Sequence, residues 1–523
     1  MLAAMPTAPD QQVPHGTARP RDRDDACPGA LRLHAADDGA LARIRIPGGV
    51  LTAGQAETLG TAAARLGDGE IHLTSRGNAQ LRGLGTSCGA ELEQLLTAAG
   101  LLPSAAHERV RNVVASPLSG LDGRGHLDVR PWLRDLDALL CASGPAQALS
   151  GRFLFALDDG RGDVSALAAD VTLRATPDGG ALLGLGRNAP VRVPADTAAR
   201  AALLAAEVFV GAATTAVTAT AADLPSTGAA PPTAWRVTDL PDGGAALSAE
   251  VARRLAESGT PATPPGTRPA NGPRGKGGPA PGIVRHPQLP CAVVALSVLA
   301  PLGRLTAGQW RALVALAGRT EDAELRLTPW RGVVVPGVHE ADAQRESAAL
   351  AAIGLVTDPR SPWMGVGACV GRPGCAKSLA DVRADAAAAL PDPDDGASRL
   401  PVYWSGCARG CGRPRGDRVD VVATPGGYRV DVVRDGTART VAEIAAPTDP
   451  AGPGNTRTGT VGTGTVETGT VKAGNTRTDA VGTTVETGTV EADDTRTETA
   501  GAGTRPADLA ATVAAARRGA VSR

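Results

Sequence analysis

The sequence lacks the features that would place it in several broad classes. No run reaches the roughly 18 apolar residues that a transmembrane helix needs, and no apolar signal segment precedes Gln11. The formal net charge is −1, so no overall charge favours nucleic acid or a membrane surface. Eight cysteines in 523 residues argue against a disulfide scaffold. We therefore expect a cytoplasmic protein that binds neither nucleic acid nor membrane.

Lysine is almost absent. The chain has three lysines, Lys276, Lys377 and Lys472, against 50 arginines. Arginine enrichment alone is weak support for anion binding. An anion site must therefore be argued from the positions of particular arginines.

Half of the cysteines form two pairs, Cys369 with Cys375 and Cys407 with Cys411. Thiolate is the soft ligand that iron–sulfur clusters require, and a cubane takes four. Structural zinc sites usually space their cysteines two to four residues apart, so the five-residue gap in the first pair fits zinc poorly. The spacing favours a cluster, with zinc and unliganded core thiols as alternatives. The single cysteines are interpreted as structural or incidental: Cys27, Cys88, Cys141 and Cys291.

A strand, helix and strand unit occurs twice in the chain. Leu51–Gln55 and Leu305–Gln309 both read Leu-Thr-Ala-Gly-Gln, in which the Thr and the Gln form a capping box that begins a helix. Glu70–Thr74 and Glu324–Thr328 follow at the same offset as strands. A duplication predicts a pseudo-two-fold protein with its active site between the halves. The alternative is two unrelated units of similar composition.

Three segments have the composition of tails or linkers. Residues 1–26 are predicted to be a disordered tail. Residues 223–282 are predicted to be a linker with one possible helix, at Ser248–Ser258. Residues 447–523 are predicted to be a low-complexity tail, rich in Thr, Gly and Val, with a possible short helix at Ala507–Arg518.

The paired cysteines, followed by Gly412-Arg413-Pro414, resemble the cluster-binding half of the sulfite and nitrite reductases. Within that superfamily the chain is most similar to the precorrin-3B synthases. The resemblance implies an α+β fold with two ferredoxin-like half domains, at 27–102 and 283–354. It also implies two larger α+β domains in a pseudo-two-fold arrangement, at 103–222 without a cluster and at 355–446 with a 4Fe-4S cluster.

The resemblance also implies roles for basic residues. Thr74–Gln80 matches the segment that places an arginine over the tetrapyrrole, which gives that role to Arg76, and Arg111 matches a second anion-facing arginine. Both are expected to be catalytic. Guanidinium is always charged and pairs bidentately with carboxylates. The alternative for each is a surface or interdomain salt bridge. The residues expected to bind substrate are Arg76, Arg111, Arg152, Arg331, Lys377 and Arg409.

Two departures count against a six-electron reductase. The reductases carry two lysines in the first half that supply charge and protons, and this chain has Arg152 and the apolar Leu154 at those positions. Tyr403 stands where the family usually has a histidine. The first departure suits a site that binds a large organic acid.

By resemblance, the four paired cysteines hold a 4Fe-4S cluster and the chain carries an additional non-haem iron. The implied reaction hydroxylates precorrin-3A with dioxygen and closes a γ-lactone, in aerobic cobalamin synthesis. The electron donor would be NADH through a reductase, or ferredoxin. One alternative is an assimilatory sulfite or nitrite reductase that holds sirohaem. Another is a non-catalytic iron–sulfur electron carrier, in which anion-facing arginines would have no use.

Overall fold

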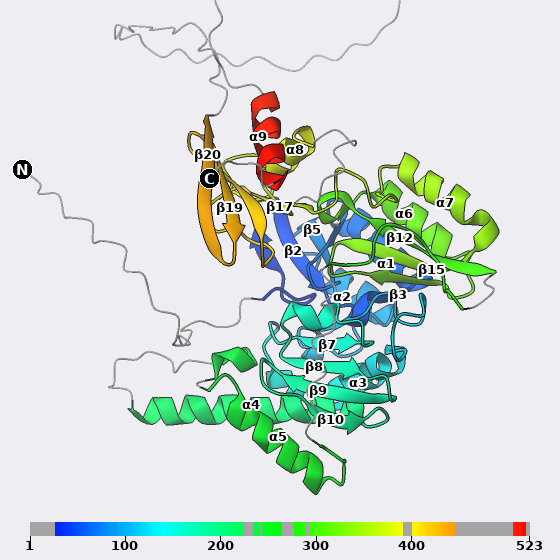
Figure 1. Cartoon of the computed structure of the whole chain (residues 1–523), viewed down its shortest axis with the longest axis vertical. Coiled ribbons are helices and arrows are strands. Elements are labelled where there is room, and N and C mark those ends of the chain that lie inside the picture. The colour runs from blue at the N-terminus through cyan, green and yellow to red at the C-terminus, as the bar shows by residue number, and fades with distance from the viewer. Residues whose placement is uncertain are drawn as a thin grey trace, which may run out of the picture.

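The computed structural model describes residues 27–223, 234–240, 242–263, 277–288, 292–390, 400–445 and 506–518. Four five-stranded sheets with flanking helices make up this part of the chain, which confirms the α+β class (Figure 1). None of its helices is long and apolar enough to cross a membrane. The predicted tail at residues 1–26 and residues 447–505 of the predicted tail at 447–523 lie outside the described residues.

Each half of the chain begins with a small sheet covered by helices. The first half domain consists of β1 (His34–Ala36), β2 (Gly39–Ile44), α1 (Ala53–Leu66), β4 (Ile71–Leu73), β5 (Ala79–Leu84) and α2 (Gly89–Ala98). The second consists of β11 (Gly282–Val284), β12 (Val293–Leu299), α6 (Ala307–Ala317), β14 (Glu324–Leu327), β15 (Gly332–His339) and α7 (Glu340–Ala352).

Both predicted capping boxes are confirmed. The Thr52 hydroxyl accepts from the Gln55 backbone N–H at 3.2 Å, and the Thr306 hydroxyl accepts from the Gln309 N–H at 3.3 Å. In each box the glutamine side chain accepts from the threonine N–H in return. Each pair therefore satisfies two N–H groups that the first turn of a helix leaves unpaired.

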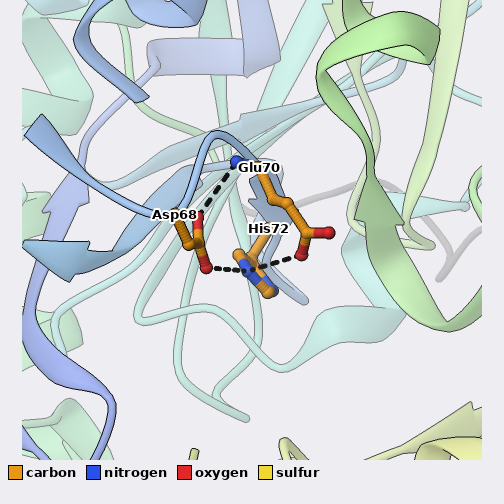
Figure 2. Close-up of side chains that lie close together, drawn as sticks. All are labelled: Asp68, Glu70 and His72. Atoms are coloured by element: carbon orange, nitrogen blue, oxygen red, sulfur yellow. Dashed lines mark hydrogen bonds and ion pairs between the residues drawn. The ribbon is translucent and has the colours of Figure 1, made fainter. Parts of the chain in front are cut away.

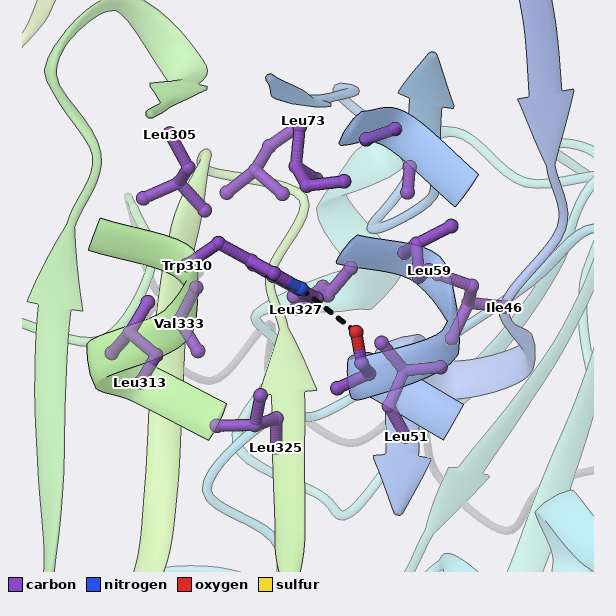
Figure 3. Packing of buried hydrophobic residues seen from close by; sticks show 14 of the residues in the cluster. Ile46, Leu51, Leu59, Leu73, Leu305, Trp310, Leu313, Leu325, Leu327 and Val333 are labelled. Atoms are coloured by element: carbon purple, nitrogen blue, oxygen red, sulfur yellow. Dashed lines mark hydrogen bonds between the residues drawn. The ribbon is translucent and has the colours of Figure 1, made fainter. Parts of the chain in front are cut away.

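The two half domains exchange strands. β3 (Val50–Thr52), from the first half, pairs with β14 in the sheet of the second, and β13 (Arg304–Leu305), from the second half, pairs with β4 in the sheet of the first. Helices α1 and α6 pack against each other, and the Trp310 indole of α6 donates to the Ala56 carbonyl of α1 at 2.8 Å (Figure 3). One hydrophobic core is shared by both half domains.

The two larger domains have the same sheet topology, so the duplication extends to them. Three neighbouring parallel strands are followed by two antiparallel ones in each. The first sheet contains β6 (Val113–Ala115), β7 (Phe155–Asp158), β8 (Val171–Ala175), β9 (Gly180–Leu185) and β10 (Val191–Pro194). The second contains β16 (Val366–Ala368), β17 (Val402–Ser405), β18 (Arg418–Thr424), β19 (Gly427–Arg434) and β20 (Thr437–Ala445).

The segment predicted to be a linker is partly packed into the first larger domain, which also contains α3 (Arg130–Ala142) and α4 (Ala198–Asp223). Its predicted helix is present as α5 (Ala245–Glu257), which buries Leu247, Val251 and Leu255 in that domain's core. The composition suggested a linker because Pro, Gly, Ala and Thr dominate it, but a few apolar residues at helical spacing are enough to dock it.

The predicted terminal helix is present as α9 (Pro506–Arg518), which packs against β18 and β20 (Figure 1). It shares a hydrophobic core with α8 (Val382–Ala388). It buries Val513 and Ala516 in the core of this domain. Arg517 donates to the carbonyls of Leu400 and Met364 at 3.0 and 2.8 Å. The low-complexity tract therefore joins two fixed points, Ala445 and Pro506.

Deleting Gly454–Gly503 should leave iron content, turnover and melting temperature nearly unchanged. About ten residues would still join β20 to α9, and each halving of a loop lowers its closure cost by only about 0.6 kcal/mol. Thermal unfolding and iron analysis would check this. A chain truncated after Ala445 is the control, because it also loses α9 and should melt at a lower temperature. Equal losses in both variants would show that the tract itself is needed.

Candidate active site

Four cysteine thiols line one cavity of about 690 Å³, named here the cysteine cavity. β16 and β17 are neighbouring parallel strands, so both end at the same edge of the sheet. Cys369 follows β16 directly, and Cys407 lies two residues beyond β17. Cys375 and Cys411 come from the same two loops. The structure thus brings the four predicted ligands together, and their role as ligands remains a prediction.

The loops around these thiols fit an iron–sulfur cluster. The Gly406 N–H donates to Cys369 Sγ at 3.2 Å, the kind of amide contact that tunes a cluster thiolate. Gly410 and Gly412 have φ values of 57° and 80°, which favour glycine, and a Cβ on Gly412 would lie 2.8 Å from Tyr403 Oη. The second cysteine loop can therefore pass close to the strand beneath it.

Tyr403, which replaces the usual histidine, supports this loop. Its side chain is fully buried, and its hydroxyl donates to the Cys411 carbonyl. Burial raises the pKa of Tyr403 to about 12, so the phenol stays neutral. The Arg331 guanidinium lies 6.0 Å from the centre of the Tyr403 ring. Tyr403 therefore positions the loop that carries Cys411.

A second cavity of about 480 Å³, named here the arginine pocket, adjoins the first. Arg43, Thr74 and Ser75 line both cavities. Among the described residues, no carboxylate lines the arginine pocket. Its arginines are Arg43, Arg45, Arg76, Arg152, Arg236 and Arg415.

The electrostatics of the arginine pocket favour an anion. Burial, followed by repulsion from Arg45 and Arg236, lowers the pKa of Arg76 to about 10. Burial and repulsion from Arg45 also lower the pKa of Arg43. Buried Arg43 Nε and Arg45 Nη1 have no hydrogen-bond partner in the part of the chain that the structure describes. A bound carboxylate would relieve this repulsion and supply acceptors.

Arg43 and Arg45 were not predicted as site residues. They lie two residues apart on extended chain and so on the same face. Arg45 donates to the Gly151 carbonyl at 3.0 Å and to Cys27 Sγ at 3.2 Å, so Cys27 helps to hold the pocket. A signal was present, since Arg43-Ile-Arg-Ile46 places two charges on one side of a strand that pairs with the segment after Arg76.

Arg236 comes from the segment predicted to be a linker. Its guanidinium contacts the Asp170 carboxylate and donates to the Ala168 carbonyl at 2.7 Å. The neighbouring Trp235 ring lies 4.7 Å from the Arg152 guanidinium. Nothing in the local sequence indicated that this segment reaches the pocket.

Arg111 does not face either cavity, which corrects the expected position. Its Nε and Nη2 both donate to the Asp137 carboxylate at 2.7 Å, and Nη1 donates to the Leu101 carbonyl at 3.1 Å. Only 5% of the residue is exposed. The guanidinium is paired with Asp137 on α3. The salt-bridge alternative therefore describes Arg111 better than a role facing the substrate.

The other predicted residues do reach the cavities. Arg331, Lys377 and Arg409 line the cysteine cavity, whereas Arg76 and Arg152 line the arginine pocket. Leu154, where a reductase would have a lysine, is buried in a small apolar cluster with Val114, Ala156, Val164 and Ala169. No proton donor therefore stands at that position.

The equivalent edge of the first larger domain holds carboxylates in place of thiols. Arg161 pairs with Asp122 at 2.8 Å and with Asp159 at 2.6 Å, in the loops that follow β6 and β7. Burial raises the pKa of the neighbouring Asp163 to about 6. In the described part of these loops there is no cysteine. This edge is closed by ion pairs and offers no soft ligands.

Comparison with known proteins agrees with the duplication. The nitrite/sulfite reductase ferredoxin-like half domain matches residues 34–99 and again residues 286–353. The solved structure of the NirA protein of Mycobacterium tuberculosis has the same fold, with a TM-score of 0.58 over 77% of both chains at 20% identity.

Two curated relatives are similar in sequence. A precorrin-3B synthase from Sinorhizobium is 29% identical over 413 residues, which are 78% of this chain and 82% of that protein. A ferredoxin–nitrite reductase from Synechococcus elongatus is 35% identical over 127 residues, 23% of this chain and 25% of that protein. The first likeness covers most of both chains and the second covers about a quarter.

Proposed function

Because this chain carries the two half domains and the fold of the nitrite and sulfite reductases, we propose a function within that superfamily. The proposed activity is that of a precorrin-3B synthase: oxygen-dependent hydroxylation of precorrin-3A with closure of a γ-lactone. The long similarity to a precorrin-3B synthase supports it. The observation that carries it is the arginine pocket, which adjoins the cysteine cavity and, among the described residues, is lined by six arginines and no lysine.

This arrangement suits a large polycarboxylate better than a small oxyanion. A tetrapyrrole carries acetate and propionate groups, and each can form a charge-assisted pair with one guanidinium. Reduction of sulfite or nitrite also needs several proton donors, whereas Leu154 is apolar and buried and the arginines hold their protons at neutral pH.

The cysteine cavity would hold the 4Fe-4S cluster through Cys369, Cys375, Cys407 and Cys411. A cluster at this place supplies electrons one at a time. The arginine pocket would bind and orient the carboxylates of the substrate. Positive charge beside the thiols comes from Arg331, Lys377 and Arg409. Tyr403 keeps the loop of Cys411 in place.

The proposal is tested by following oxygen atoms. Protein prepared without oxygen is incubated with precorrin-3A, a reductant and isotopically labelled dioxygen, and the product is examined by mass spectrometry. We expect one labelled oxygen atom in the macrocycle, because the second atom leaves as water and the lactone oxygens come from the acetate. Labelled water with ordinary dioxygen is the control and should add no label.

The rival is a sulfite or nitrite reductase that holds sirohaem, which the short matches to nitrite reductases favour. It predicts an unmodified precorrin-3A, a bound macrocycle in the purified protein, and rapid reduction of sulfite or nitrite by the same reductant. That result would overturn the proposal.

A further inference from the structure

Three potential metal ligands gather at the start of β4. Asp68, Glu70 and His72 each place one ligand atom within 4.8 Å of the other two. Figure 2 shows the His72 ring between the two carboxylates. Glu70 and His72 are two apart where β4 begins, so their side chains project from the same face. Gly69 has a φ of 81°, and the bend that it forms brings Asp68 to the same place. The sequence Asp-Gly-Glu-Ile-His therefore builds the group without help from distant segments.

His72 is buried but poorly satisfied. Its Nε2 lies 3.4 Å from an Asp68 oxygen and 3.6 Å from a Glu70 oxygen, whereas N–H···O bonds are commonly about 2.7–3.2 Å. Its Nδ1 has no hydrogen-bond partner within the residues that the structure describes. Only 6% of the residue is exposed, so water does not substitute freely. A buried polar group in this condition needs a physical explanation.

The observed spacings suit a shared cation. Ligand atoms bound to one divalent metal at about 2.1 Å each lie roughly 3.0–3.5 Å apart. One imidazole with two carboxylates is a hard to borderline donor set that suits divalent iron, manganese or zinc. The Glu70 carboxylate also accepts from Arg304, which lies across the strand pair from His72. Such a bond leaves further lone pairs for a metal and orients the carboxylate.

The second half of the chain contains a matched group in which the histidine is replaced. Asp322, Glu324 and Arg326 occupy the equivalent positions of the repeat. There the Arg326 guanidinium pairs with Glu324 at 2.6 Å and donates to the carbonyls of Pro117 and Ser119. The second half thus places a permanently charged guanidinium at this position, and the first half places an imidazole, a side chain that can bind a metal.

We propose that Asp68, Glu70 and His72 bind a divalent transition metal at the edge of the cysteine cavity, which His72 lines. Binding at this site does not depend on the proposed reaction. Use of the metal in oxygen chemistry does rest on the proposed function, so the two can fail separately.

The test is a manganese titration of the full-length protein under anaerobic conditions. Free Mn²⁺ gives a six-line electron paramagnetic resonance signal that is lost on binding, and the signal is measured against protein concentration. We expect one Mn²⁺ per chain. We expect at least tenfold weaker binding in Asp68→Asn, Glu70→Gln and His72→Gln, because each removes one ligand. Asp322→Asn is the matched control from the other repeat and should bind like the unaltered protein.

Iron and sulfide content of each variant shows whether it has folded around its cluster. Asp68 is one-third exposed, so Asp68→Asn should fold even if His72→Gln does not. The proposal is wrong if the unaltered protein binds no Mn²⁺, if all three variants bind it equally well, or if Asp322→Asn loses as much affinity as Asp68→Asn. If Fe²⁺ displaces the one bound Mn²⁺ per chain, the result extends to iron.

Discussion

Cys407→Ser is expected to leave the protein colourless. The unaltered protein, purified without oxygen, should be brown and contain about four iron and four sulfide for the cluster. Serine offers a hard oxygen in place of a soft thiolate, so the remaining three cysteines cannot hold the cluster stably. Iron and sulfide analysis with visible spectroscopy measures the change. Serine at position 369, 375 or 411 should have the same effect.

The single cysteines provide the control for this loss. Cys88 and Cys141 do not line the cysteine cavity, and serine at either position should leave iron and sulfide unchanged. A Cys407→Ser protein that keeps its full iron and sulfide would contradict the ligand assignment. Loss of cluster in Cys88→Ser would show that the analysis reports misfolding and not ligation.

Arg76→Ala and Arg111→Ala should have different effects, although sequence motifs gave them the same role. Arg76 lines the arginine pocket, so its loss should weaken precorrin-3A binding by about 1.5–3 kcal/mol, or roughly 10- to 150-fold, with the cluster spectrum intact. Arg76→Lys should restore binding only in part, because an ammonium cannot form the planar bidentate pair. Equilibrium binding of precorrin-3A measures both variants.

Arg111→Ala should instead lower the free energy of unfolding. It leaves the Asp137 carboxylate without its partner, and breaking a buried ion pair costs about 3–5 kcal/mol. We expect a loss near the lower end of this range, because a quarter of the Asp137 side chain is exposed to solvent. Urea denaturation measures this change. If Arg111→Ala has normal stability and binds precorrin-3A more weakly, Arg111 acts in substrate binding and the structural role is wrong.

Local signals in the sequence predicted much of the fold. Thr52 with Gln55 and Thr306 with Gln309 each start a helix through contacts three residues apart, so both helices could be placed and aligned as a repeat. The exchange of β3 and β13 could not be predicted in this way. Two- and three-residue strands carry little pattern of their own, and their partners are set by packing between segments far apart in the chain.

The same distinction applies to the residues of the candidate site: local sequence predicts some of them and not others. The cysteine spacing carries its chemistry in the residues themselves, so the four thiols could be predicted to meet. Arg111 matches a motif, but the motif does not reveal that Asp137 lies within reach of its guanidinium. Arg236 stands in a segment whose composition resembles a linker, and only docking of α5 and Trp235 brings it to the arginine pocket.

The reciprocal exchange of β3 and β13 has the geometry of a domain-swapped two-fold dimer joined into one polypeptide. In a symmetric ancestor, both copies of the site would have had to change together, because one gene specified both. Joining the two copies in one polypeptide removes that constraint. One descendant half could keep thiols at the end of its parallel strands while the other acquired Asp122, Asp159 and Arg161. Each five-stranded sheet includes one strand from the other half. Neither half can complete its sheet alone, so the two diverging halves stay in one folded unit.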